Sequence, residues 1–136
     1  MKYLQIRKEG SIATVSINRP NAMNALSIEV LKEFCTLQEY FRKDLDTRVV
    51  IFTGEGNHFS AGADLKEKPQ LSTKLESWRN NFGKPAIKSI LDIDQITIAA
   101  VNGYCLGGAA CIVSACDFRI ASEKAILGYP EINLGI

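Results

Sequence analysis

The stretch ITIAAVNGYCLGGAACIVSAC, residues 96–116, contains no charged side chain. A run of this length is long enough to raise the question of a membrane span. Its interior argues against one, because Asn102-Gly103 and Gly107-Gly108 are strong turn signals. They divide the run into a short strand at Ile96–Val101, a turn, and a short helix of small residues at Gly107–Cys116. The stretch is therefore expected in the middle of a protein core, with no membrane partner.

Strands and helices alternate outward from this stretch. A hairpin opens the chain, with β-forming residues at 3–8 and 12–18 around a Glu-Gly-Ser turn. The apolar run Arg48–Thr53 is typical of a strand covered on both faces, and another strand is expected at Phe118–Ala121. One more segment begins at Ile126. This alternation predicts an α/β fold in one domain.

Two helices are expected to cover the sheet. The first starts at Ser27, a good N-cap, and its apolar positions recur at spacings of three and four: Val30, Phe34, Leu37, Phe41 and Leu45. Residues 54–69 form a long, mostly polar loop with three glycines, and such loops are often functional. A middle helix then runs from about Ser72 into the Leu91 region. Its larger side chains are predicted core residues: Trp78, Phe82 and Ile87.

Composition excludes several classes of function. The 136 residues are 46% hydrophobic and 23% charged, which suits one globular core. Sixteen Lys and Arg against 15 Asp and Glu leave a net charge of +1, too balanced for a nucleic-acid partner. Residues 1–7 lack the apolar core and cleavage site of a secretory signal, so we expect a cytoplasmic protein.

The cysteines do not form a metal-binding pattern. They include no CxxC pair, and the single histidine, His58, leaves zinc-type ligand spacing incomplete. No metal is therefore expected. The cysteines are predicted to be small buried hydrophobic residues: Cys35, Cys105, Cys111 and Cys116.

Two glycine-containing turns are the candidates for chemistry. Ser60–Asp64 and Gly103–Ala110 each leave backbone N–H groups free at the start of the next segment. Two such donors directed at one carbonyl oxygen form an oxyanion hole, and glycine lets a substrate approach the backbone closely. Taken separately, each is more often an ordinary tight turn. Spacing alone does not bring them together.

Ordered segments along the chain resemble the crotonase superfamily, the enoyl-CoA hydratase/isomerase family. They are, in order, Arg19–Leu26, Phe59–Lys66, Ala99–Gly108, Cys116–Ser122 and Gly128–Glu131. The resemblance covers essentially the whole chain and about the first half of a typical family member. It implies a crotonase-like spiral of ββα turns. Residues 1–136 are thus expected to be the N-terminal core of that domain, apparently truncated before its C-terminal helical region.

The resemblance also implies a binding mode for an acyl-CoA thioester. The thioester carbonyl is expected to meet two backbone N–H groups, which map by position onto Ala63 and Gly108. The family's CoA-binding positions map onto Met23, Ala25, Ala61, Asp64 and Leu65. Coenzyme A is then part of the substrate, and no prosthetic group is expected. Family members use C-terminal helices to cover the pocket and to form trimers or hexamers, so a homotrimer or hexamer is expected where that region exists.

One departure from the family pattern bears on the reaction. Hydratases of the family use two glutamates, one on the helix after the paired glycines and one in a Pro-Glu turn. This sequence keeps the second as Glu131 but has Cys111 at the first, three residues beyond Gly108. A neutral thiol replaces a carboxylate poorly. Isomerases of the family work with one glutamate, so the predicted reaction is a 1,3-proton shift with Glu131 as base. Cys111 is then expected to line the acyl pocket.

Two alternatives stay open. A hydratase, or a related lyase or decarboxylase, is possible if another group or a bound water replaces the missing carboxylate. A CoA-binding or assembly module without turnover is the other, because of Cys111 and because the residues of the C-terminal helices are not in this chain.

Overall fold

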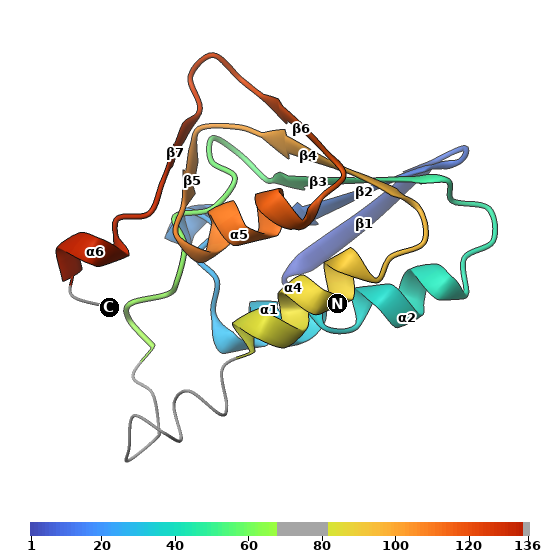
Figure 1. The fold of residues 1–136 in the computed structure, drawn as a ribbon, viewed down its shortest axis with the longest axis horizontal. Helices are drawn as coiled ribbons and strands as arrows, with labels where there is room; N and C mark the ends of the chain where they lie inside the picture. Colours follow the sequence, from blue (N-terminus) through green and yellow to red (C-terminus); the bar gives the residue numbers. More distant parts are fainter. Residues whose placement is uncertain (68–81, 135–136) are drawn as a thin grey trace.

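The computed structural model describes residues 1–67 and 82–134, which form two sheets with helices on one side of the larger (Figure 1). Five strands make the larger sheet: β1 (Leu4–Glu9), β2 (Ile12–Ile17), β3 (Val49–Gly54), β4 (Ile96–Val101) and β6 (Phe118–Ala121). Their order is β1-β2-β3-β4-β6. The first pair is antiparallel and the other pairs are parallel. This confirms the predicted hairpin and the α/β class.

A second sheet has two parallel strands, β5 (Tyr104–Leu106) and β7 (Ile126–Gly128). Each follows a strand of the larger sheet and precedes a helix, α5 (Gly108–Ala115) or α6 (Glu131–Leu134). The chain thus contains two successive ββα units, the arrangement that the family resemblance implied. Strand β5 was not predicted, because its three residues carry the glycine-flanked signature of a turn.

The uncharged stretch 96–116 folds as β4, β5 and α5, so its predicted strand and helix are confirmed. In the described part of the chain, no helix is long and apolar enough to cross a membrane.

The predicted helix over 27–45 is wrong as a single element. Two short helices occur instead, α1 (Ile28–Phe34) and α2 (Leu37–Arg42). The Ser27 hydroxyl caps α1 by accepting a hydrogen bond from the Val30 N–H at 3.2 Å, as predicted. The break falls at Thr36, whose hydroxyl donates to the Glu33 carbonyl and so competes with the helical hydrogen bonds. Leu45, expected on the apolar face, lies beyond α2 and is 91% exposed.

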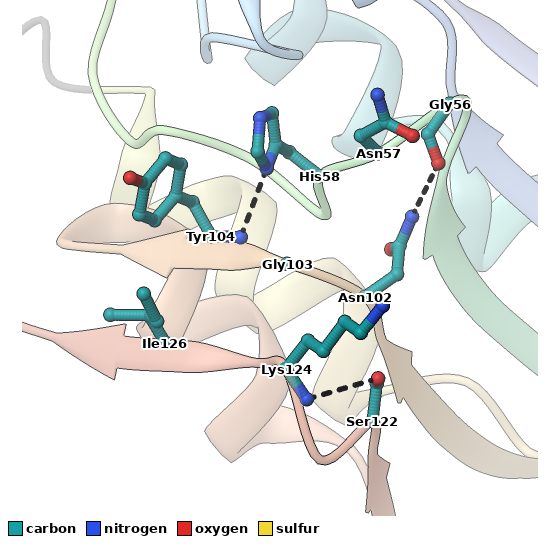
Figure 2. Close-up of a pocket in the computed structure, with 9 residues that line it drawn as sticks. All are labelled: Gly56, Asn57, His58, Asn102, Gly103, Tyr104, Ser122, Lys124 and Ile126. Atoms are coloured by element: carbon teal, nitrogen blue, oxygen red, sulfur yellow. Dashed lines mark hydrogen bonds between the residues drawn. The ribbon is translucent and has the colours of Figure 1, made fainter.

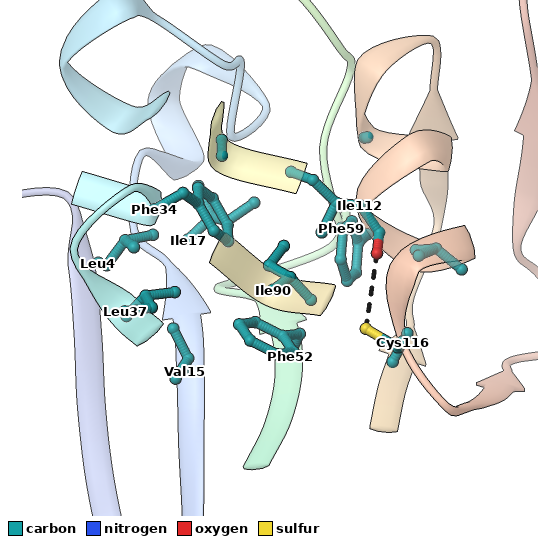
Figure 3. Close-up of a cluster of buried hydrophobic side chains, with 14 of the residues drawn as sticks. Leu4, Val15, Ile17, Phe34, Leu37, Phe52, Phe59, Ile90, Ile112 and Cys116 are labelled. Carbon is teal, nitrogen blue, oxygen red and sulfur yellow. Dashed lines mark hydrogen bonds between the residues drawn. The ribbon is translucent and has the colours of Figure 1, made fainter. Parts of the chain in front are cut away.

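The core lies between the larger sheet and these helices (Figure 3). Phe34 of α1 packs against Phe52 of β3, with ring centroids 6.2 Å apart. The other face of β3 is only half-buried, so the prediction of a strand covered on both faces is wrong. Phe59 is fully buried and anchors the loop after β3 in this core.

The middle helix is confirmed at its end as α4 (Gly83–Leu91). Ile87 packs against the core as expected, and Phe82, just before α4, is half-buried. The predicted helix start at Ser72 and the predicted core residue Trp78 lie outside the described residues.

Candidate active site

The loop after β3 is held between two neighbouring segments. On one side, the Ser60 N–H donates to the Tyr104 carbonyl at 2.9 Å, and the Leu106 N–H donates to the Ser60 carbonyl at 3.1 Å. On the other side, the Leu26 N–H donates to the Gly62 carbonyl at 2.8 Å, and the Asp64 N–H donates to the Leu26 carbonyl at 3.2 Å. Residues 60–64 therefore run as an extended segment between 23–26 and β5.

This arrangement determines where the Ala63 N–H points. Leu26 hydrogen-bonds both residues that flank Ala63, and the two form a parallel bridge. In such a bridge, the residue between the two bonded positions directs its own N–H away from the partner strand. The Ala63 N–H accordingly has no acceptor within residues 1–67 and 82–134, and the residue is exposed.

The second glycine turn leads into α5. Gly107 precedes the helix with φ 55° and ψ −123°, a conformation that favours glycine, and its N–H donates to the Gly128 carbonyl at 2.8 Å. Gly108 is the first residue of α5, so its N–H has no intrahelical acceptor. No other acceptor for this N–H is found among the described residues.

The two glycine turns touch each other. A β-carbon placed on Gly62 would lie 2.6 Å from the Leu106 carbonyl oxygen and 3.8 Å from the Gly107 Cα. Both predicted oxyanion residues, Ala63 and Gly108, directly follow these glycines in the sequence. The two turns, which spacing alone could not bring together, are therefore in contact in the fold.

Glu131 lies against the second turn. It is the first residue of α6, and a β-carbon placed on Gly107 would overlap its carboxylate, with the carboxyl carbon at 2.8 Å. The Glu131 Oε2 atom is buried and has no hydrogen-bond partner in the described part of the chain. An unpaired buried carboxylate oxygen is costly in free energy, so its presence beside the second glycine turn needs an explanation.

Cys111 occupies the first turn of α5 and is exposed, so the prediction of a buried residue is wrong at this position. Cys105 and Cys116 are buried, as predicted, and Cys35 is half-buried. Burial raises the pKa of the Cys105 thiol to about 11 and that of the Cys116 thiol to about 12. The thiols of Cys105 and Cys116 are therefore unreactive at neutral pH. Cys111 is the exposed cysteine beside them.

The predicted CoA-binding residues lie in or beside the loop after β3, residues 55–67, which is called the first loop below. Met23 is 48% exposed and Leu65 is 71% exposed. Ala61 is half-buried and donates its N–H to the Met23 carbonyl at 3.0 Å, whereas the Ala25 side chain is buried. Met23 and Leu65 therefore present accessible apolar side chains to a ligand, whereas the side chain of Ala25 is not accessible.

Asp64 is already engaged within the protein. Its carboxylate pairs with Arg19 at 3.0 Å and accepts a hydrogen bond from the Lys66 N–H at 3.1 Å. The Arg19 guanidinium also donates to the Ala25 carbonyl at 2.6 Å. Asp64 therefore joins the first loop to the segment that carries Met23 and Ala25.

Sequence reasoning missed Asn24. Its backbone is left-handed, with φ 54°, and the residue is fully buried. Asparagine tolerates this conformation better than most residues. The signal in the sequence was therefore an asparagine at position 24, where a left-handed backbone could be expected.

A separate pocket of about 490 Å³ lies beside the ends of β4 and β6 (Figure 2). The His58 ring stacks on Tyr104 at 4.7 Å, and its Nδ1 atom accepts a hydrogen bond from the Tyr104 N–H at 3.2 Å. This pocket includes none of Ala63, Gly108 and Glu131. In residues 1–67 and 82–134, no group of three or more His, Cys, Asp or Glu side chains is placed to hold a metal ion.

Successive ββα units that bring two glycine turns and a carboxylate together define a recognisable class of protein. The chain belongs to the enoyl-CoA hydratase/isomerase family, whose pattern matches residues 7–136. This confirms the crotonase superfamily membership predicted from the ordered segments.

Individual relatives agree with this assignment. The chain is 40% identical over 132 residues to the short-chain-enoyl-CoA hydratase of Clostridium acetobutylicum, covering 96% of this chain and 51% of that protein. The crystal structure of an enoyl-CoA hydratase/carnithine racemase from Magnetospirillum magneticum matches with a TM-score of 0.94 at 30% identity, covering 100% of this chain and 52% of that one. Enoyl-CoA hydratase from Bacillus anthracis matches at 0.90 and 34% identity, over 98% and 53% of the two chains. The chain therefore spans about half the length of the relatives it matches.

Proposed function

We propose that this protein catalyses a 1,3-proton shift in an enoyl-CoA thioester, with Glu131 as the base. The observation that carries the proposal is the buried, unpartnered Oε2 atom of Glu131 beside Gly107. A general base needs an oxygen that is free to accept a proton at the site of transfer, and Oε2 makes no hydrogen bond that would compete for it.

In the proposed reaction, the thioester carbonyl accepts hydrogen bonds from the N–H groups of Ala63 and Gly108. Glu131 removes a proton from C2 of a 3-enoyl thioester, and the electron pair moves to the carbonyl oxygen as an enolate. The two N–H donors stabilise this developing charge more than they stabilise the neutral substrate. Glu131 then returns the proton to C4, which leaves the double bond between C2 and C3. One carboxylate suffices for both transfers.

The CoA moiety is proposed to lie along the first loop. Met23 and Leu65 are exposed and apolar beside that loop, and the Ala61 backbone is fixed by the Met23 carbonyl. Asp64 would act there through its ion pair with Arg19. Cys111, exposed in the first turn of α5, would border the acyl chain.

Hydration of a 2-enoyl-CoA is the second candidate, and the names of the relatives favour it. The proteins from Clostridium acetobutylicum and Syntrophomonas wolfei are named short-chain-enoyl-CoA hydratase and crotonyl-CoA hydratase. Hydration is helped by two carboxylates that position the water, and the first turn of α5 offers Cys111 at the expected place. In a hydratase, another group or a bound water would have to take the role of the missing carboxylate.

The test is product analysis with cis-3-enoyl-CoA and trans-2-enoyl-CoA, using the protein and its Glu131→Gln variant. We expect isomerisation of the first substrate, little hydration of the second, and loss of isomerisation in the variant by about 10²-fold or more. Glu123→Gln, at an exposed position, is the matched control and should keep its activity. Hydration without isomerisation would reject the proposal in favour of a hydratase. Tight CoA-thioester binding without any turnover would indicate a binding module instead.

A further inference from the structure

Asn24 joins its own loop to the turn after β3 through three side-chain hydrogen bonds. The Oδ1 atom accepts a hydrogen bond from the Arg19 N–H at 2.8 Å. The Nδ2 amide donates to the carbonyls of Glu55 at 2.9 Å and His58 at 2.7 Å. Because Asn24 is fully buried, losing any of these three hydrogen bonds would leave a polar group unpaired and would be costly.

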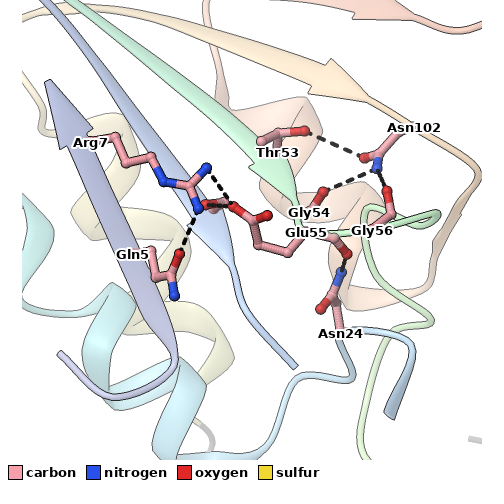
Figure 4. A network of polar contacts seen from close by, with 9 residues as sticks. Gln5, Arg7, Asn24, Thr53, Gly54, Glu55, Gly56 and Asn102 are labelled. Atoms are coloured by element: carbon pink, nitrogen blue, oxygen red, sulfur yellow. Dashed lines mark hydrogen bonds and ion pairs between the residues drawn. The ribbon is translucent and has the colours of Figure 1, made fainter. Parts of the chain in front are cut away.

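Two of these three hydrogen bonds hold the turn that leads into residues 61–64, the segment that carries the proposed oxyanion donor Ala63 and is called the oxyanion loop below. Residues 55–58 form the turn after β3, and their chain continues into the segment that contains Ala63. Figure 4 shows Asn24 reaching the Glu55 carbonyl from one side of this turn, while Asn102 reaches Gly54 and Gly56 from the other. The turn is therefore held by side-chain amides on both sides.

The neighbours of Asn24 in the chain hold the oxyanion loop itself. Met23 accepts a hydrogen bond from Ala61, and Leu26 bonds to both Gly62 and Asp64. Segment 23–26 is thus the surface on which residues 61–64 lie. The Asn24 side chain fixes this surface to the turn from which the loop starts.

The Ala63 N–H makes no hydrogen bond of its own to the described chain, so only its neighbours direct it. An oxyanion donor works because it is oriented before the charge develops. A displacement of about 1 Å can lower the rate about 10²-fold. A contact that fixes segments 23–26 and 55–58 relative to each other therefore also fixes the orientation of the Ala63 N–H.

We propose that Asn24 is a positioning residue for the Ala63 N–H. This inference rests on the proposed function, because it requires that Ala63 act as an oxyanion donor. Asn24 touches no reacting atom and acts through the backbone of Met23, Leu26 and the 55–58 turn. Its removal should weaken stabilisation of the enolate, and because segment 23–26 also carries Met23 and Ala25, it should weaken binding of the CoA thioester too.

The test compares Asn24→Asp with Gln95→Glu. Gln95 provides a matched control, because its Nε2 amide also donates to two carbonyls, those of Phe41 at 2.9 Å and Asp44 at 3.2 Å. It lies just before β4, at the opposite end of the strands from the glycine turns. Both substitutions replace a doubly donating amide by a carboxylate, so both should lower the melting temperature.

Only Asn24→Asp is expected to lower kcat for enoyl-CoA isomerisation at saturating substrate, by about 10- to 100-fold, and KM should rise as well because the same segment carries CoA-binding residues. Asn24→Gly is the second variant, because glycine adopts the left-handed backbone without strain and loses all three hydrogen bonds. It should show the same loss of kcat. Kinetics are measured at a temperature at which circular dichroism shows each variant to be folded.

Unchanged kcat in folded Asn24→Asp and Asn24→Gly would overturn the inference while leaving the proposed function intact. An equal loss of kcat in Gln95→Glu would also overturn it, since general loosening would then explain the effect. If the unsubstituted protein converts no enoyl-CoA, the proposed function fails first and the inference falls with it.

Discussion

Replacing Gly107 by alanine tests the contact between the second glycine turn and Glu131. A methyl group there would overlap the Glu131 carboxylate and stand 2.8 Å from its carboxyl carbon, whereas ordinary van der Waals contact begins at 3.4 Å. The carboxyl carbon must therefore move by more than half an ångström, and the oxygen nearest the methyl must move further. A displacement of about 1 Å at a reacting group corresponds to about 10² in kcat, or about 2.7 kcal/mol of transition-state stabilisation.

Gly107→Ala also places a side chain at φ 55°, which costs about 1–3 kcal/mol of folding free energy. Gly10→Ala separates the two effects, because Gly10 has φ 57° and no heavy atom within 4 Å of the added carbon. Both variants should therefore unfold at lower urea concentration, and only Gly107→Ala should lose isomerase activity. Steady-state kinetics on cis-3-enoyl-CoA would measure this. If folded Gly107→Ala keeps kcat within about twofold of the unsubstituted protein, Glu131 does not act from its place beside Gly107.

Three further outcomes are expected. Cys111→Glu adds a carboxylate in the first turn of α5 and should raise hydration of trans-2-enoyl-CoA by about tenfold or more, measured by loss of enoyl absorbance; an unchanged rate would mean that this position does not reach the water site. Ser27→Ala removes the α1 cap and should lower the free energy of unfolding by about 1 kcal/mol in urea titrations. Hydrogen bonds from Lys8 and then Thr47 hold the pKa of Asp44 at about 2, below the usual 3.8. The resulting stability is present above pH 4 and is lost as pH falls toward 2, so Asp44→Asn should flatten the acid unfolding curve there.

The strands of the larger sheet were predictable because most of them are short apolar or β-branched runs between turn residues. Val49–Gly54 and Ile96–Val101 follow this rule, and the structure places them where the sequence predicts. The single helix expected over 27–45 failed for a local reason. Apolar spacing continues through Thr36, but its hydroxyl bonds back to Glu33 and the helix ends there.

The candidate site was only partly predictable. The resemblance to a known family supplied Glu131, Ala63 and Gly108 as residues, but no spacing argument could bring the turns together. Their contact depends on hydrogen bonds between residues far apart in the chain, such as Ser60 with Tyr104 and Leu26 with Gly62. Periodicity reports on local structure and does not detect such pairings.

Asn24 was missed for the same reason. In the sequence it is one polar residue among several in a loop, and its three partners lie 5, 31 and 34 residues away. Only the fold shows that its amide is buried among carbonyls.

The order of strands in the larger sheet follows their order in the chain, β1-β2-β3-β4-β6, and the short strands β5 and β7 form the second sheet. Each new strand thus pairs with one that the ribosome has already released. The sheet can grow in one direction during synthesis, and no earlier strand has to separate to admit a later one. At every stage, the growing sheet presents one open edge to the next strand, and β6 provides that edge in the described chain.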